Sequence, residues 1–335
     1  MATDININKV RLNCFRQSKV RGEFMLQMRV PAGFIDAKHL TLVQQIAEKF
    51  GNGTFHMGTR QFFSIPGIKY ESIDEVNAFI KDYIDEVEVK LCGVDMDTSN
   101  GYPAIGARNI VACIGNIHCP KANINTQDIA RKLEKEIFPS HYHIKLSVAG
   151  CPNDCAKAHF NDFGIVGLTK PEYDADRCIG CGMCVKACDH HATRVLSGNN
   201  GRVEKDACCC VGCGECVLAC PTGAWSRSVK KFYRILIGGR TGKQYPRMGT
   251  TFVDFVTEDV VISIMKNWQE FSATVLDHKP EYLDGGHLID KAGYKLFKEM
   301  MLKDVTLNPE ARVAERVYWH ETEYRGRIHV KPASN

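Results

Sequence analysis

The sequence lacks several features that mark common protein classes. No apolar run is long enough to span a bilayer, and residues 1–8 show no charged stretch followed by an apolar one, so no secretory signal is expected. Lys and Arg are scattered rather than massed in one tract, which argues against a nucleic-acid surface. The glycine-rich residues 238–242 read G-G-R-T-G, which does not match the G-x-G-x-x-G fingerprint of dinucleotide-binding proteins, and no other segment of the sequence matches it. We therefore expect the chain itself to bind no nicotinamide or flavin.

What the chain has in excess is cysteine. Its 335 residues include 16 cysteines, while 44% of residues are hydrophobic and 24% are charged, the composition of a soluble globular protein with a sizeable core. Without a secretory signal, this many cysteines indicate metal ligation rather than disulfides. We therefore expect a cytoplasmic protein that works anaerobically or shielded from oxygen.

Four cysteines in the middle of the chain form two spaced pairs. Cys113 and Cys119 are separated by five residues, and Cys151 and Cys155 by three. Two thiolate pairs about 30 residues apart can hold one 4Fe-4S cluster, which needs four soft sulfur ligands. The alternative is a set of ordinary buried thiols.

Residues 172–228 contain eight further cysteines in two runs with the spacing of two-cluster bacterial ferredoxins. In that pattern the fourth cysteine of each run ligates the other cluster. We therefore predict one 4Fe-4S cluster on Cys178, Cys181, Cys184 and Cys220, and a second on Cys210, Cys213, Cys216 and Cys188. A zinc ribbon is the alternative for this segment, which we call the insert.

Four cysteines remain outside these sets. Cys14 and Cys92 have no partner by spacing, and we expect them to be small buried hydrophobic residues. Cys208 and Cys209 crowd the second run of the insert and could shift its register, although only Cys210 gives the regular spacing.

Hydrophobic periodicity predicts an α+β arrangement around the cysteines. Before residue 100 it indicates a βαββα order, with a strand at 22–30, a helix capped by Asp36 and ended by Gly51, a strand or hairpin at 54–65 and a helix near 71–86. Later elements are a helix at 126–138, strands at 143–148, 163–168 and 232–237, and a final helical stretch near 287–303.

The two central cysteine pairs, with the segment G-C-P-N-D-C that contains Cys151 and Cys155, resemble the siroheme–4Fe-4S site of the sulfite and nitrite reductase family. The resemblance covers nearly the whole chain and includes the C subunits of anaerobic, NADH-linked sulfite reductases. It implies that Cys155 bridges the cluster to siroheme. It also implies an α+β fold in four parts: a ferredoxin-like half-domain over 1–100, a siroheme and 4Fe-4S domain over 101–171 that resumes over 229–335, and a ferredoxin-like insert over 172–228.

The resemblance also indicates the cations that would surround the bound groups. Sulfite is a small dianion and siroheme carries many carboxylates, so the site needs fixed positive charges. Arg29 and Arg108 resemble arginines that face the substrate, and Arg60 resembles one that contacts siroheme carboxylates. For each, the simpler interpretation is a solvated surface charge.

Three more residues are candidates for this site. His143 and Lys145 resemble a K-x-K pair, which strand alternation places on one face. The histidine stands where the family has the first lysine, and it still offers a proton near neutral pH. Arg240 lies in a glycine-rich turn that could approach the macrocycle.

The implied reaction is the six-electron reduction of sulfite to sulfide, with electrons entering through the insert. The implied partners are an iron–sulfur electron-transfer subunit and a flavin- and NADH-binding subunit. Self-association is a further expectation, because only one half of a scaffold that is duplicated in assimilatory relatives can be counted. Two alternatives remain: a siroheme nitrite reductase that forms ammonia, and an iron–sulfur subunit that only transfers electrons.

Overall fold

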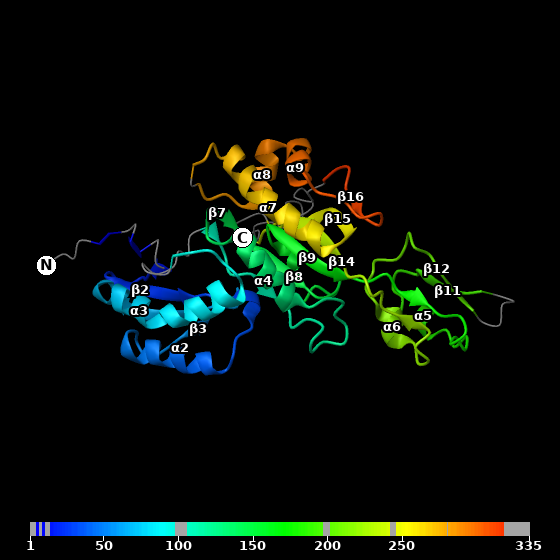
Figure 1. Ribbon diagram of the computed structural model, residues 1–335, viewed down its shortest axis with the longest axis horizontal. Helices are drawn as coiled ribbons and strands as arrows, with labels where there is room; N and C mark the ends of the chain where they lie inside the picture. Colours follow the sequence, from blue (N-terminus) through cyan, green and yellow to red (C-terminus); the bar gives the residue numbers. More distant parts are fainter. Residues whose placement is uncertain are drawn as a thin grey trace, which may run out of the picture.

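The structure is a computed structural model that describes residues 5–6, 9–10, 14–97, 106–196, 202–241, 246–279 and 281–317. Figure 1 shows three parts in a row. A small sheet with two helices occupies one end, a larger sheet covered by helices lies in the middle, and the insert projects at the other end.

The N-terminal part is an antiparallel sheet with the strand order β1-β2-β4-β3. Side chains of β2 alternate between buried and half-buried, because successive side chains of a strand point to opposite faces. The bounds are β1 (Phe15–Gln17), β2 (Glu23–Met28), β3 (His56–Met57), β4 (Phe63–Lys69), α2 (Lys38–Lys49) and α3 (Ile73–Ile84), with 3-10 turns η1 (Pro31–Gly33) and η2 (Tyr70–Ser72) and the π-helical η3 (Asp85–Leu91).

Two sequence-based expectations for this part need correction. The sheet has an additional edge strand, β1, ahead of the predicted βαββα order. The sequence did not predict this strand, because three residues are too few to give a periodic signal. Asp36 does not cap α2, because the residue before the helix is Ala37 and no side-chain cap bond forms there.

The central part is a six-stranded mixed sheet with the order β16-β15-β14-β9-β8-β6. The pairs β6–β8 and β8–β9 are parallel, and the others are antiparallel. The strands are β6 (Val111–Ala112), β8 (Leu146–Ala149), β9 (Phe163–Leu168), β14 (Phe232–Ile237), β15 (Thr250–Val256) and β16 (Arg312–Val313), and β5 (Gly106–Ala107) pairs separately with β7 (Ser140–Ile144).

Helices cover this sheet, with α7, α8 and α9 gathered along one side in Figure 1. The helical stretch predicted near 287–303 is divided into two helices, because Gly293 adopts φ 82° between them. The bounds are α4 (Thr126–Ile137), α7 (Glu258–Val275), α8 (Gly285–Ala292), α9 (Tyr294–Met301) and the 3-10 turn η4 (Ala158–Phe160). None of the described helices has both the length and the apolar character that a bilayer crossing requires.

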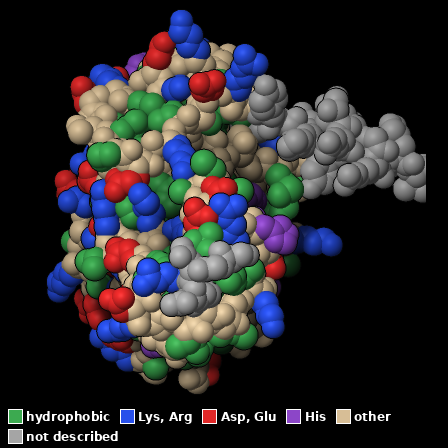
Figure 2. All heavy atoms as spheres, turned by 90° about the vertical axis from the view of Figure 1, so that its right-hand side faces the viewer, with side chains coloured by type: hydrophobic (Ala, Val, Ile, Leu, Met, Phe, Trp, Pro, Cys, Tyr) green, Lys and Arg blue, Asp and Glu red, His purple; other side chains and the backbone are tan. Residues whose placement is uncertain are grey.

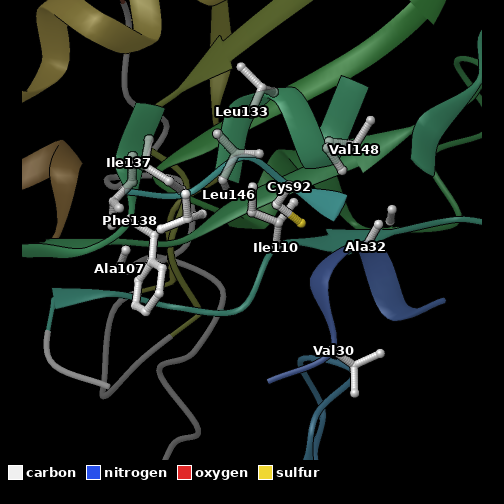
Figure 3. Packing of buried hydrophobic residues seen from close by; sticks show 14 of the residues in the cluster. Val30, Ala32, Cys92, Ala107, Ile110, Leu133, Ile137, Phe138, Leu146 and Val148 are labelled. Carbon is white, nitrogen blue, oxygen red and sulfur yellow. The ribbon is translucent and has the colours of Figure 1, made fainter. Parts of the chain in front are cut away.

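One hydrophobic core joins the N-terminal and central parts. Figure 3 shows Val30 and Ala32, near η1, in the same cluster as Leu133 of α4 and Leu146 of β8. Because the cores are continuous, the N-terminal sheet packs firmly against the sheet that carries the central cysteines.

The insert has its own small core, built from Cys184, Val203, Cys216 and Trp225. It leaves the central sheet after β9 and returns at β14, and these two strands are paired neighbours. Its elements are β10 (Glu172–Tyr173) paired with β13 (Trp225–Ser226), β11 (Thr193–Val195) paired with β12 (Val203–Lys205), and the short helices α5 (Met183–Lys186) and α6 (Glu215–Ala219).

Figure 2 views the molecule from the end that carries the insert. Lys and Arg side chains are interspersed there with Asp and Glu, and hydrophobic side chains lie among them. The face is therefore mixed in charge rather than of one sign.

Candidate functional site

The four central cysteines meet at one cavity. Cys113, Cys119, Cys151 and Cys155 all line a space of about 720 Å³. Cys113 follows β6, and Cys151 comes shortly after β8, the parallel neighbour of β6. Because the carboxyl ends of parallel strands lie at the same edge of a sheet, the two loops converge on this cavity.

Hydrogen bonds fix the loop that contains Cys113. The carbonyl of Cys113 accepts from Thr126 Oγ1 and from Gln127 Nε2, both at the start of α4. The amide of Gly150 donates to Cys113 Sγ over 3.1 Å. A Cβ at Gly150 would lie 2.6 Å from the Ala122 Cβ, so only glycine allows the two cysteine loops to approach this closely.

These residues fit an iron–sulfur cluster with a second group beside it. Four soft sulfur donors converge, and of the four Cys155 is the exposed one. The same cavity continues along Thr59, Arg60, Lys145 and Thr241, which gives it a polar and cationic side. The chemistry of the wall therefore suits a cluster that adjoins an anionic macrocycle.

Arg60 forms part of the cavity wall and joins the N-terminal part to the central sheet. Its Nη1 donates to Asn161 Oδ1 and its Nη2 to the Leu146 carbonyl, each over 2.6 Å, and its Nε donates to the Asn109 carbonyl. Burial lowers the pKa of Arg60 to about 10, so the guanidinium remains charged at neutral pH.

Arg29 is not part of the described lining of the large cavity, and its guanidinium has protein partners. Its guanidinium forms ion pairs with Glu88 and Glu134, donates to the Ala107 carbonyl and lies 4.0 Å from the centre of the Phe138 ring. It lines a separate cavity of about 200 Å³ together with Arg60 and Arg108. By its ion pairs, Arg29 connects residues from the N-terminal and central parts of the chain.

Arg108 lines the same smaller cavity as Arg29. Its amide donates to the Ile144 carbonyl, and its guanidinium carbon lies 5.9 Å from the centre of the Tyr282 ring. The side chain is half-buried, between the two sheets.

Lys145 lines the large cavity, and Asp284 holds its ammonium. The distance from Nζ to Oδ1 is 2.8 Å, and the lysine side chain is 29% exposed. Burial lowers the pKa of Lys145, but the hydrogen bond to Asp284 and the nearby Asp162 carboxylate raise it more, so the net shift is upward. The ammonium is thus a fixed charge at the wall.

His143 lies behind Lys145 rather than at the cavity. It is 2% exposed, its Nε2 lies 3.4 Å from Asp284 Oδ1, and its ring centre lies 3.9 Å from that of Tyr282. Burial lowers its pKa, so the imidazole is neutral at neutral pH. The strand predicted over 143–148 is interrupted at Lys145, which lies between β7 and β8. The side chains of His143 and Lys145 nevertheless both reach Asp284.

Arg240 sits at a backbone bridge with Arg247, with hydrogen bonds of 2.9 and 2.8 Å. Its guanidinium contacts His287, and the next residue, Thr241, lines the large cavity. Arg240 therefore lies beside the cavity without being part of its described lining.

The insert brings Cys188 to the second cysteine run. Cys188, Cys210, Cys213 and Cys216 line one small cavity, whereas Cys178 and Cys220 pack against the core that contains Cys184. The ligand loops turn at Gly182 and Gly214, which adopt φ 69° and 82°. The first group is the one that crossed ligation requires for the second cluster, whereas the core that Cys178 and Cys220 contact also contains Cys216 and does not separate the two sets.

The remaining cysteines lie elsewhere. Cys14 and Cys92 are buried, and burial raises the pKa of the Cys92 thiol to about 12. Cys208 and Cys209 are exposed, and their amides donate to Asp206 Oδ1.

Sequence reasoning missed several residues that complete the site. Asn161, Asp162, Tyr282 and Asp284 contact the predicted cations, but no spacing or motif connects them to the cysteines. Asp284 is separated from Lys145 by 139 positions in the chain, so only the fold relates them.

Comparisons with known proteins agree with this geometry. The family model "Nitrite and sulphite reductase 4Fe-4S domain" matches residues 104–307, and "Nitrite/Sulfite reductase ferredoxin-like half domain" matches residues 16–83. The chain is 53% identical over 337 aligned positions to the C subunit of the anaerobic sulfite reductase of Salmonella typhimurium, with all of both chains covered. It is 26% identical to the coenzyme F420-dependent sulfite reductase of Methanocaldococcus jannaschii, over 85% of this chain and 44% of that protein.

A solved structure of dissimilatory sulfite reductase I has the same fold, with a TM-score of 0.63 and 16% identity. The match covers 92% of this chain and 78% of the other. Together with the two family models it confirms the predicted fold class, an α+β ferredoxin-like half-domain with a 4Fe-4S domain.

Proposed function

The chain belongs to the nitrite and sulphite reductase family, and from this premise we infer that it is the catalytic subunit of a siroheme-dependent sulfite reductase. The observation that carries the inference is the cavity of about 720 Å³, where four cysteines and the ammonium of Lys145 share one wall. Full-length similarity to a protein named as part of an anaerobic sulfite reductase supports sulfite over nitrite as the substrate.

A siroheme–4Fe-4S centre, when bound, supplies electrons for the six-electron reduction of sulfite to hydrogen sulfide. Cys113, Cys119, Cys151 and Cys155 would hold the cluster, and Cys155 would also bridge to siroheme, in keeping with its exposure to the cavity. These assignments rest on the donor set and its convergence.

The chain's own cations would act on the substrate. Lys145, fixed by Asp284, places a positive charge at the wall, where it can hold a sulfite oxygen and give it a proton as the oxygen leaves as water. Arg60 and Arg240 would face siroheme carboxylates. Arg108 would add positive charge from the adjoining cavity, whereas the ion pairs of Arg29 favour a supporting role.

We further propose three 4Fe-4S clusters, two of them in the insert, and electron entry through the insert. The partners would be an iron–sulfur subunit and a flavin- and NADH-binding subunit in the cytoplasm, with self-association as a second means of completing the half-scaffold. The mixed charge of the insert's end suits a protein partner. The domain limits proposed for this arrangement are 1–100, 101–171, 172–228 and 229–335.

An iron count and a visible spectrum test the proposal. Anaerobically purified chain should contain about thirteen irons, twelve in three clusters and one in siroheme. Acid–acetone should extract an iron-chlorin-like chromophore, and a small artificial reductant should drive sulfite reduction to sulfide. About nine irons and no extractable chromophore would contradict a catalytic role and leave electron transfer. Faster turnover of nitrite to ammonia would favour the nitrite reductase alternative.

A further inference from the structure

A cluster of three titratable side chains lies directly behind Lys145. The ligand-type atoms of His143, Asp162 and Asp284 all lie within 4.8 Å of one another. His143 and Asp162 are buried, with 2% and 0% exposure, and Asp284 is 21% exposed. The cluster thus extends from the protein interior to the lysine at the cavity wall.

Asp162 is held in place by backbone amides rather than by a cation. Its Oδ2 accepts from the amide of Lys145 and its Oδ1 from the amide of Gly285, each over 2.7 Å. Burial raises the pKa of this carboxyl to about 7, so it carries a proton part of the time at neutral pH.

His143 connects Asp162 to Asp284. Its Nε2 lies 3.9 Å from Asp162 Oδ2 and 3.4 Å from Asp284 Oδ1, the oxygen that also accepts from Lys145. At these distances neither ring nitrogen has a well-formed hydrogen bond among the described residues. A buried imidazole in this state can take up and release a proton without breaking a hydrogen bond to the protein.

We propose that His143, Asp162 and Asp284 form a proton relay that recharges Lys145 between successive proton transfers to the substrate. The inference rests on the proposed function, since each sulfite oxygen that leaves as water consumes protons. Lys145 gives one proton to a departing oxygen and becomes a neutral amine. Asp162 gives its proton to Nε2 of the neutral His143, the imidazolium gives that proton to the shared Asp284 oxygen, and Asp284 passes it to Nζ. Between turnovers a proton from solvent enters at Asp284, which is partly exposed, and returns through His143 to the buried Asp162. His143 and Asp162 act through Lys145 and are positioning residues.

Other charged and titratable groups face the cluster and influence how far its carboxyl groups ionise. The arginines and Lys145 favour ionised carboxylates, and burial opposes them most strongly at Asp162. These groups come from the loop before β4, the β5–β7 region and the segment around α8: Arg60, Arg108, Lys145, Tyr282 and His287.

The test compares His143→Phe with His56→Phe in the holoenzyme. Phenylalanine keeps a ring against Tyr282 and removes both nitrogens, and His56 is an exposed residue of β3 that undergoes the same chemical change. His143→Phe should retain the cofactor spectrum and a sulfite KM within about twofold of normal. Its turnover should fall about 10-fold or more, as for loss of a proton-transfer group, and the fall should be largest below about pH 7, where Asp162 carries the proton that the relay passes on. Turnover and a pH profile like those of His56→Phe would overturn the relay.

An infrared titration of the holoenzyme provides a readout that does not depend on turnover. A protonated carboxylic acid band should disappear as the pH rises through about 7, and it should be missing from Asp162→Asn. A band that persists unchanged in Asp162→Asn would refute the assignment to Asp162. A chain that shows the band but reduces no sulfite would contradict the proposed function and leave the buried proton store intact.

Discussion

Arg29 and Glu88 form an ion pair inside the protein, with 3.1 Å between Nε and Oε1 and side chains that are 5% and 1% exposed. Glu134, on α4, contacts the same guanidinium and is fully buried. Burial raises the pKa of the Glu88 carboxyl, which shows how much the carboxylate depends on its partner for its charge. One arginine therefore pairs with carboxyl groups from two parts of the chain where the sheets meet.

Replacing Arg29 should mainly harm folding. Arg29→Ala leaves two buried carboxylates without their cation, and the free energy of unfolding should fall by about 3–5 kcal/mol. Anaerobic urea unfolding measures it. Arg194→Ala breaks an exposed ion pair with Glu204 and should cost less than about 1 kcal/mol. Unchanged stability combined with a higher KM for sulfite would return Arg29 to the substrate-facing role that its resemblance implies.

Lys145→Ala should separate chemistry from cofactor binding. The variant should keep the full siroheme and cluster spectrum while sulfite turnover falls by about 100-fold or more, as for loss of an electrostatic or acid catalyst. Lys145→Arg should recover binding better than rate, because guanidinium keeps its charge but is a poor proton donor. Near-normal turnover of Lys145→Ala with intact cofactors would make this lysine an ordinary surface charge.

Cys213→Ser should reveal the route by which electrons enter. Activity that depends on the physiological partners should be lost, while a small reductant that reaches the central cavity directly should still drive sulfite reduction. Cys208→Ser provides the matched control, because that thiol is exposed and lies outside the predicted ligand sets. Equal losses in both assays would show that the insert is needed for structure alone.

Asp162 should make stability depend on pH. Burial raises the carboxyl pKa from about 3.8 to about 7, so between these values the folded chain binds a proton that the unfolded chain does not. This contribution to stability is complete below about pH 4 and is lost as the pH approaches 7. The unfolding free energy of Asp162→Asn should therefore vary less between pH 5.5 and about 7.5 than that of the unaltered chain. Parallel pH profiles for the two proteins would show that Asp162 is ionised throughout.

The cysteines could be assigned to predicted ligand sets from the sequence because cluster ligands obey local spacing rules. Spacing predicted that Cys188 meets Cys213 although the two lie in different runs, and both line one cavity. The central elements could also be predicted, since β9 and β14 are continuous apolar runs of the length that buried strands have.

The charged partners could not be predicted, because they depend on contacts between distant segments. Nothing in the sequence around Glu134 distinguishes it from a solvated residue of an amphipathic helix, yet it is buried against Arg29. Likewise, Asp284 precedes α8 in a polar segment that gives no hint of Lys145. A charge at a buried site is identified only when the fold shows what surrounds it.

The insert begins and ends at paired strands, since β9 and β14 are in register from Phe163–Ile237 to Leu168–Phe232. The short β10–β13 pair closes its base. Once folded, the insert acts on the central sheet as a tight turn does, because it holds the two strand ends side by side and removes the loop-closure entropy of the intervening chain. Before it folds, the same strands are separated by a long flexible loop and pair slowly. With two clusters in the insert, as we propose, delivery of iron and sulfide to it would set the moment at which the central sheet closes during biosynthesis.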